Sequence, residues 1–300
     1  VDACKTEREC VERSVAVAEK AGFRPYIRGG ELKPGDKVYR VNRDKAVTLA
    51  VIGKRPLSEG ANIGAAHIDS PRLDLKQNPL YESDELAYLK THYYGGIRKY
   101  QWVTIPLELH GVVALKGGQT VRVSIGGGEG DPLFTIDDLL PHLGTEQSKK
   151  PLGEAIPGET LNILVGSRPL EDDEGKDRVK LAALELLNRK YGITEEDFIS
   201  AELCAVPAFR ASDIGFDRSL IGAYGHDDRV CAYACLAALL QLSAPEYTAV
   251  CMLADKEEIG SEGVTGMKSA AFDTFMEDLC QAQNVPLRAC YEKSFCLSAD

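Results

Sequence analysis

Two adjacent glutamates follow an apolar segment late in the chain. Residues 247–254 are mostly apolar, and Glu257 and Glu258 come shortly after them. Two carboxylates at the mouth of a buried strand repel each other and lose hydration. A divalent metal would compensate, because one glutamate could bind it while the other takes a proton from a water on the metal. Taken alone, such a pair is more typical of an ordinary exposed loop than of a metal site.

Similar residues stand at the ends of three further predicted elements. An apolar run at 63–66 leads into His67 and Asp69, a run at 295–297 leads into Asp300, and Asp227 precedes an apolar helix at 230–242. Ligands gather at the carboxyl ends of strands in α/β sheets. We therefore predict that one site is formed by six residues: His67, Asp69, Asp227, Glu257, Glu258 and Asp300.

The composition of this set suggests a metal. One histidine with several carboxylates suits zinc, manganese or cobalt better than a cysteine-rich structural site would. Simpler alternatives remain open for single residues. His67 alone fits a hydrogen-bonded core histidine, and Asp227 with Asp228 fits a pair that caps a helix N-terminus.

The elements that must position these residues alternate between helix and strand. Thr6 and Glu9 predict a capping box for a first helix that ends near Gly22, and strands are expected at 46–53 and 61–69. Later, helices are expected at 228–242 and 269–282, and strands at 247–254 and 294–299. This alternation indicates an α/β domain.

The middle of the chain has a different pattern. Three short strands joined by tight turns are expected within 102–126, then a loop at 126–132, a solvated acidic loop at 171–174, a helix at 178–190 and a strand at 198–206. We predict an α/β domain made of residues 1–71 and 212–300, interrupted by an inserted β-rich domain at 72–211.

Bulk properties limit the class of protein. The net charge of −11 and the pI of about 5.1 argue against nucleic-acid or membrane-surface partners. No apolar run approaches the roughly 20 residues that span a bilayer, and no signal peptide is visible. Nine scattered cysteines indicate buried thiols in a reducing compartment. A cytoplasmic protein is expected.

Several motifs together give the chain a family resemblance. The segments AAHIDSPRLDLK, YYGGIRKYQWVTIPLELHGVV, DLLPHLG, LNILVGS, GHDDRVCAYACLAAL and ADKEEIGSEG, with the final SAD, span nearly the whole chain in order. It resembles the aspartyl aminopeptidase and aminopeptidase I family of dinuclear zinc metallopeptidases. The resemblance implies an α/β fold in which a mixed-sheet catalytic domain is interrupted by a β-rich dimerisation domain.

The resemblance also implies residue roles. His67 and Asp300 would bind one metal, Glu258 the second, and Asp227 both. Asp69 would orient the imidazole of His67, and Glu257 would be the general base. Two divalent ions are implied, zinc first, with cobalt or manganese as alternatives. The implied reaction is removal of N-terminal residues from peptides by an activated water.

Further implications concern assembly. The family forms a homo-dodecamer built from dimers, and His142 of the DLLPHLG segment matches a histidine that reaches a neighbouring subunit's site. Family members continue beyond the equivalent of Asp300, where a later histidine completes the second metal site, so we expect the chain to be a fragment. Two alternatives stay open: a related deblocking or glutamyl-type dinuclear aminopeptidase, and a catalytically silent scaffold.

Overall fold

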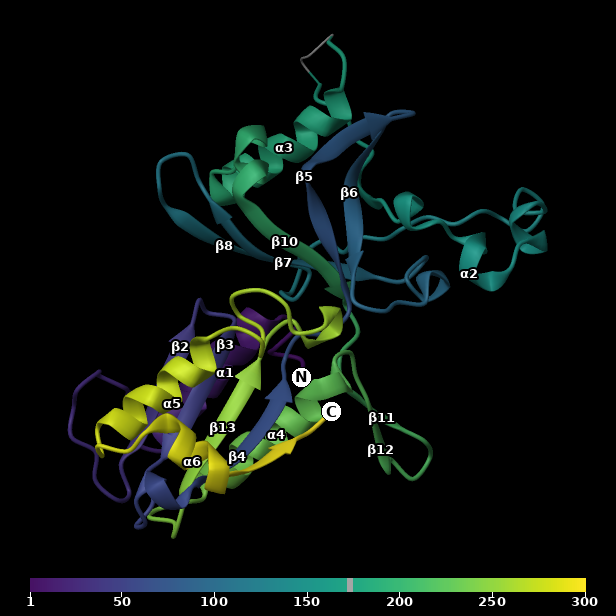
Figure 1. Ribbon diagram of the computed structural model, residues 1–300. Helices are drawn as coiled ribbons and strands as arrows, with labels where there is room; N and C mark the ends of the chain where they lie inside the picture. Colours follow the sequence, from purple (N-terminus) through teal and green to yellow (C-terminus); the bar gives the residue numbers. More distant parts are fainter. Residues whose placement is uncertain (172–174) are drawn as a thin grey trace. The chain divides into compact units, whose positions relative to one another are not determined.

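The computed structural model describes residues 1–171 and 175–300, so most of the predicted acidic loop at 171–174 lies outside the described residues. The chain divides into two compact units. The first comprises Val1–Ser70 and Ala211–Asp300, and the second comprises Pro71–Arg210. Both units are coloured by sequence in Figure 1.

A six-stranded mixed sheet forms the centre of the first unit, in the order β1-β2-β3-β13-β4-β14. Its strands are β1 (Arg24–Pro25), β2 (Lys37–Asn42), β3 (Ala46–Val51), β13 (Thr248–Ala254), β4 (Ala61–His67) and β14 (Phe295–Ser298). β4 runs parallel to both of its neighbours, β13 and β14. The carboxyl ends of these three strands therefore meet at one edge of the sheet.

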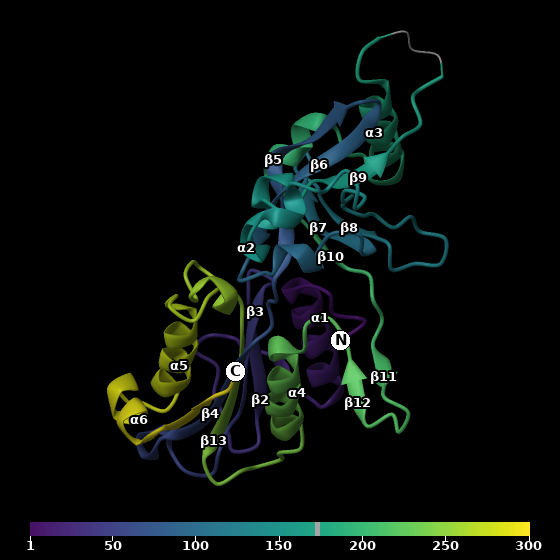
Figure 2. The ribbon, with the colours of Figure 1, turned by 90° about the vertical axis from the view of Figure 1, so that its right-hand side faces the viewer.

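Helices cover both faces of this sheet. Figure 2 shows α1 (Glu7–Lys20) and α4 (His226–Leu240) on one side, and α5 (Ala271–Gln281) and α6 (Leu287–Lys293) on the other. Separate apolar clusters fill the two interfaces. Leu49 and Leu253 pack towards α1 and α4, whereas Val250 and the fully buried Phe275 lie on the opposite face. Alternate strand residues thus serve opposite layers of the core.

The predicted start of the first helix is confirmed. The Thr6 hydroxyl accepts from the Glu9 backbone nitrogen at 3.5 Å, and the Glu9 carboxylate accepts from the Thr6 backbone nitrogen at 3.1 Å. Gly22 follows the helix with a φ of 90°, a left-handed conformation that glycine adopts without steric cost.

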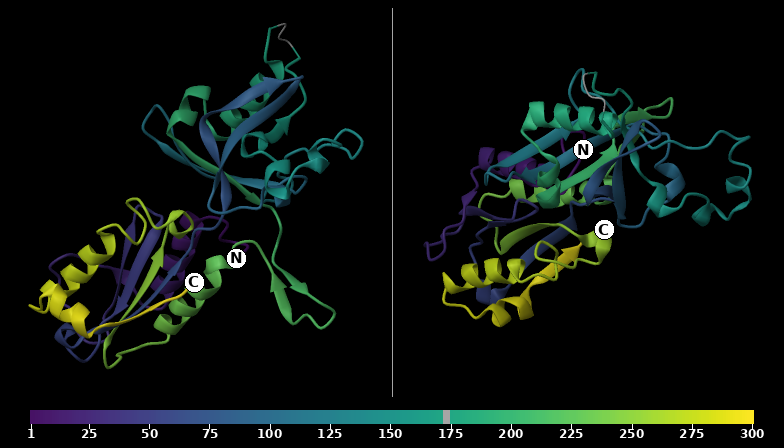
Figure 3. Two further views of the ribbon diagram at one scale, coloured as in Figure 1. Left: turned by 45° about the vertical axis from the view of Figure 1, so that its right-hand side comes forward. Right: turned by 90° about the horizontal axis from the view of Figure 1, so that it is seen from above.

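A further hairpin, β11 (Ser212–Ile214) and β12 (Leu220–Gly222), projects as a two-stranded arm (Figure 3).

An antiparallel sheet dominates the second unit, in the order β8-β7-β10-β5-β6-β9. The strands are β5 (Arg72–Ser83), β6 (Leu86–Tyr94), β7 (Leu107–Ala114), β8 (Thr120–Ile125), β9 (Ile163–Gly166) and β10 (Ala201–Pro207). The one long helix among the described residues of this unit is α3 (Arg178–Tyr191), which contacts β5, β6 and β9. The short helix α2 (Leu152–Ala155) lies in the connection before β9.

Two strand predictions in this unit were wrong. Residues 107–114 form one continuous strand, whereas two short strands, at 102–109 and 111–116, were expected. Gly111 is required within this strand, because a Cβ there would lie 1.9 Å from the Glu202 carbonyl oxygen on the neighbouring strand. The strand expected at 198–206 begins at Ala201, because residues 195–200 form a 3₁₀ helix whose Asp197 carboxylate accepts from Thr194.

Candidate metal centre

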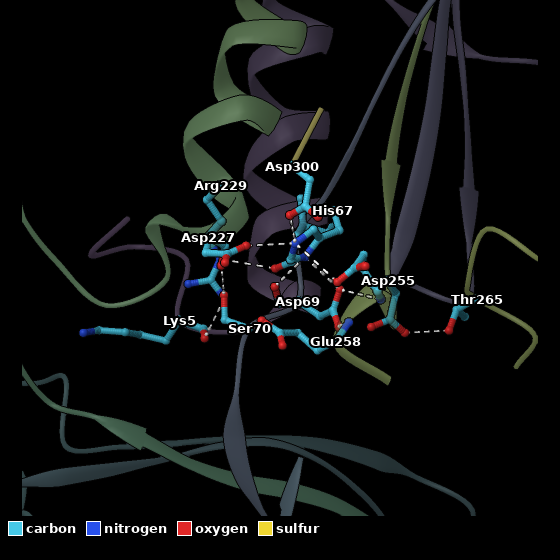
Figure 4. Close-up of polar contacts among 12 residues, drawn as sticks. Lys5, His67, Asp69, Ser70, Asp227, Arg229, Asp255, Glu258, Thr265 and Asp300 are labelled. Atoms are coloured by element: carbon cyan, nitrogen blue, oxygen red, sulfur yellow. Dashed lines mark hydrogen bonds and ion pairs between the residues drawn. The ribbon is translucent and has the colours of Figure 1, made fainter. Parts of the chain in front are cut away.

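The predicted site residues of the first unit emerge at one edge of its sheet. His67 ends β4 and pairs with Ala254, the last residue of β13. Glu257 and Glu258 follow β13 in a 3₁₀ turn, η6 (Glu257–Ile259). Asp300 lies two residues beyond the end of β14, on the other side of β4. Figure 4 shows the side chains of Asp227 and Asp300 directed towards the imidazole of His67.

The imidazole of His67 is buried, and its Nε2 faces three carboxylates. The side chain is only 2% exposed. Its Nε2 lies 3.1 Å from Asp227 Oδ1, 3.5 Å from Asp300 Oδ1 and 3.8 Å from Glu257 Oε2. A single nitrogen cannot donate to three acceptors, so this arrangement suits a shared cation better than three hydrogen bonds.

Asp69 holds the other ring nitrogen of His67, Nδ1, in place. His67 Nδ1 lies 3.0 Å from the Asp69 carbonyl oxygen and 3.3 Å from Asp69 Oδ1. A proton on Nδ1 would be donated to these oxygens, which leaves the Nε2 lone pair directed at the carboxylate cluster. The Asp69 carboxylate also accepts from the backbone nitrogens of Glu257, at 3.2 Å, and Glu258, at 3.3 Å.

The two aspartates at the start of α4 differ sharply in exposure. The Asp227 side chain is 74% exposed, whereas Asp228 is buried and its Oδ2 has no hydrogen-bond partner among the described residues. Donor atoms of His67, Asp228 and Asp300 all lie within 4.8 Å of one another. Proximity to Nε2 favours Asp227 as a metal ligand, and an unsatisfied buried oxygen favours Asp228. The peptide bond between them is cis.

Two neighbouring side chains hold the backbone around this cluster. Ser70 Oγ donates to the Asp227 carbonyl oxygen at 2.9 Å. The buried guanidinium of Arg229 donates to the carbonyl oxygens of Ile68, at 3.2 Å, and Lys5, at 3.1 Å. Ser70 and Arg229 were not predicted to support the site, and Asp228 was expected only as part of a helix cap. An arginine at the start of an otherwise apolar helix was the available signal for Arg229.

Burial and neighbouring charges raise the pKa values of Glu258 and His67. Burial, followed by the charges of Asp227 and Asp69, raises the pKa of Glu258 to about 7. For His67, burial would lower the pKa, but the hydrogen bond and charge of Asp69 and the charge of Asp228 outweigh it and raise the pKa to about 9. A divalent cation would bind the neutral imidazole and the ionised carboxylates, and so would displace protons from this set.

His142 and the cluster around His67 belong to different units of the chain. His142 belongs to the second unit, on an exposed loop, and the three leucines around it, Leu139, Leu140 and Leu143, are also exposed. In the same loop, Glu146 pairs with Lys149 at 2.6 Å.

Comparison with known proteins identifies the family. The family model described as aminopeptidase I zinc metalloprotease (M18) matches residues 1–300. The chain belongs to this family. The resemblance predicted from the motifs is therefore confirmed, and so is the α/β fold with a mixed sheet and a β-rich second part.

Relatives support the assignment at high similarity. A Clostridium acetobutylicum protein named "Probable M18 family aminopeptidase 1" is 50% identical over 305 residues, which cover 99% of this chain and 66% of the relative. The crystal structure of the Thermotoga maritima M18 aminopeptidase matches with a TM-score of 0.94 at 43% identity, covering 100% of this chain and 66% of that one. The S. cerevisiae mApe1 dodecamer shares the fold, with a TM-score of 0.78 at 20% identity, covering 100% of this chain and 69% of that one. The chain thus spans 60–66% of the length of the first curated relatives that it matches.

Proposed function

We propose that this protein is an aminopeptidase that hydrolyses N-terminal residues from peptides at the cluster around His67. The observation that carries the proposal is the placement of Asp227, Asp300 and Glu257 within 3.8 Å of one imidazole nitrogen. Membership of a zinc metalloprotease family supports zinc as the cofactor, with cobalt or manganese as alternatives.

Two divalent ions are proposed for this cluster. His67 and Asp300 would hold one, Glu258 the other, and Asp227 would be shared, with Asp228 available as a further ligand from its buried position. When bound, two such ions would polarise the scissile carbonyl and lower the pKa of a water. Asp69 would keep His67 in the tautomer that presents Nε2.

Glu257 is proposed as the general base. Its carboxylate lies 3.8 Å from His67 Nε2, and its side chain is 44% exposed, so it can reach both the cluster and solvent. Its backbone is held by the Asp69 carboxylate. Glu257 would accept a proton from the attacking water and deliver it to the departing amine, a role that typically contributes ~10²–10⁴-fold in rate.

The second unit is proposed as an oligomerisation domain. The boundaries expected from sequence, 72–211, differ by one residue at each end from the compact unit Pro71–Arg210. We propose a homo-oligomer, a dodecamer built from dimers, in which the exposed leucines around His142 meet a partner and His142 reaches the partner's peptide substrate. A relative of the same fold is described as a dodecamer.

Location and other partners complete the proposal. None of the helices in the described part of the chain has the length and apolarity that a membrane crossing requires. With a net charge of −11, we propose a cytoplasmic protein that acts on peptides and not on nucleic acid or membranes.

Metal content and turnover test the proposal together. Zinc should bind at two ions per chain by elemental analysis, and leucine and aspartate anilides should be compared as substrates. Turnover that disappears on chelation and returns with zinc would support an aminopeptidase. Two tightly bound ions without turnover of any aminoacyl anilide would instead indicate a silent scaffold.

A further inference from the structure

The second unit contains a cavity of about 670 Å³ between its sheet and α3. The floor consists of buried aliphatic side chains from four strands: Leu80, Leu89, Leu109 and Ile125. Helix α3 lies over this face of the sheet (Figure 1). A hollow of this size, with an apolar floor, lies in the 300–1,000 Å³ range of small-molecule sites.

The surrounding backbone forms the side wall and leaves the cavity open. Phe134 pairs with Leu107 on β7, and Thr135 pairs with Leu164 on β9, so the segment around them bridges two strands that are not neighbours in the sheet. On α3, the small side chain of Ala183 lines the cavity where a larger residue would fill it. All of the residues that line the cavity belong to the second unit.

Two basic side chains, in the last turn of α3, line one end of the cavity. Arg189 pairs with Glu185 at 2.6 Å, and Lys190 lies 3.3 Å from Asp131 Oδ1. Both cations are more than half exposed, and exposed ion pairs of this kind contribute little free energy. The other oxygen of Asp131 already accepts from the backbone nitrogens of Gly126 and Gly128. Both cations can therefore exchange their partners for an anion.

We propose that this cavity binds an amphipathic carboxylate, with its aliphatic chain against the strand side chains and its carboxylate at Arg189 and Lys190. The floor offers no charged group, which restricts the inner part of the ligand to hydrocarbon. The cationic end selects an anion in a chain whose overall charge is −11. The site lies in the second unit and does not depend on the proposed peptidase activity at His67.

Decanoate is the probe for this site, titrated into the protein by calorimetry. Decyltrimethylammonium, with the same chain and the opposite charge, should bind at least tenfold more weakly. Octanoate should also bind more weakly, since each buried methylene strengthens binding by about fourfold. Equal affinity for the two ten-carbon probes, or no saturable binding of decanoate, would overturn the proposal.

Substitutions on α3 locate the binding. Ala183→Trp should weaken decanoate binding at least tenfold by filling the cavity, and Ala182→Trp, on the same helix but outside the lining, should not. Replacing Arg189 or Lys190 by Gln should weaken decanoate about two- to fivefold each and leave decanol unchanged. If Ala183→Trp fails to fold by circular dichroism, Ala183→Leu serves as the smaller filler. Undiminished decanoate binding in a folded Ala183 variant would refute the site. A variant that changes the oligomeric state, in a protein that binds no decanoate, would also refute it and would show that a partner subunit occupies the cavity.

Discussion

The carboxylate of Asp69 accepts a hydrogen bond from the backbone nitrogen of Glu257, 188 positions later in the sequence, at 3.2 Å. The same carboxylate lies 3.3 Å from His67 Nδ1. One side chain therefore fixes both the orientation of the imidazole and the turn that carries the two glutamates. Asp69, two residues after the end of β4, thus connects His67 with the turn that follows β13.

Asp69→Asn should weaken zinc binding about 10–100-fold, as substitution of a residue that orients a metal ligand typically does. The amide has one acceptor oxygen in place of two, so it cannot serve His67 and both backbone nitrogens. Competition with a chromophoric chelator would measure the affinity. Asp273→Asn, at an exposed carboxylate bonded to Tyr291, is the matched control. Equal zinc affinity in the two variants would contradict the linking role.

Glu257→Gln should retain its metal and lose turnover by ~10²–10⁴-fold, because the amide cannot accept the water proton. Metal analysis and anilide hydrolysis would be measured on the same sample. Glu262→Gln, at an exposed glutamate paired with Lys268, should keep both properties. A Glu257→Gln protein with more than about half of the parent rate would show that another group is the base.

Asp227→Ala should cost both metals, since one carboxylate is proposed to be shared. Asp228→Ala tests the competing indication from burial. If Asp228 only supports the site, its loss should leave metal bound, and elemental analysis should show a clear difference between the two variants. Retention of one full equivalent in Asp227→Ala would rule out sharing by that residue and direct attention to Asp228.

The strand ends that carry the candidate site could be predicted, because a strand end is visible in the local sequence pattern. The apolar runs before His67, Glu257 and Asp300 define three strands, and their parallel pairing brings those residues to one edge. Pairing itself depends on contacts distant in sequence. The contacts of Ser70 and Arg229 could therefore not be predicted, because they involve backbone 157 and 161 positions away. The sequence showed only that Arg229 stands at the start of an apolar helix.

Errors in the second unit have a similar origin. Two short strands were expected on either side of His110, whereas residues 107–114 form one continuous strand in which Gly111 closely approaches Glu202. Strands β5 and β6 were not predicted. Lys76, Gln77 and Asn78 interrupt the apolar pattern of β5 where the register of the pair shifts. The secondary structure of these segments depends on tertiary packing more than on local propensity.

Leu140→Glu with Leu143→Glu should reduce the size of the assembly in light scattering. The two leucines are 58% and 65% exposed, and contiguous exposed apolar groups mark contact surfaces. Burying two carboxylates in such a contact would oppose association. Leu186→Glu, at a leucine of α3 that is 64% exposed, is the control. Assemblies of unchanged size in the double variant would place the subunit contact elsewhere.

Asp197→Asn should destabilise the second unit by about 1–3 kcal/mol at neutral pH. Asp197 is buried, and its carboxylate accepts from the Lys116 backbone nitrogen at 2.8 Å, the Thr194 backbone nitrogen at 2.8 Å and the Thr194 hydroxyl at 2.7 Å. The hydrogen bonds from Thr194 lower the pKa of Asp197.

The sign of the pH dependence follows from that lowered pKa. The unfolded chain binds a proton at Asp197 more readily than the folded one, so the stabilisation is present above the unfolded value of about 4 and is lost as the pH falls through the folded value. Urea unfolding at a series of pH values should therefore show the parent and Asp197→Asn converging in acid. Glu196→Gln, which removes only an exposed pair with Lys116, should follow the parent throughout. A constant difference between the parent and Asp197→Asn down to the lowest pH would show that the carboxylate charge does not contribute.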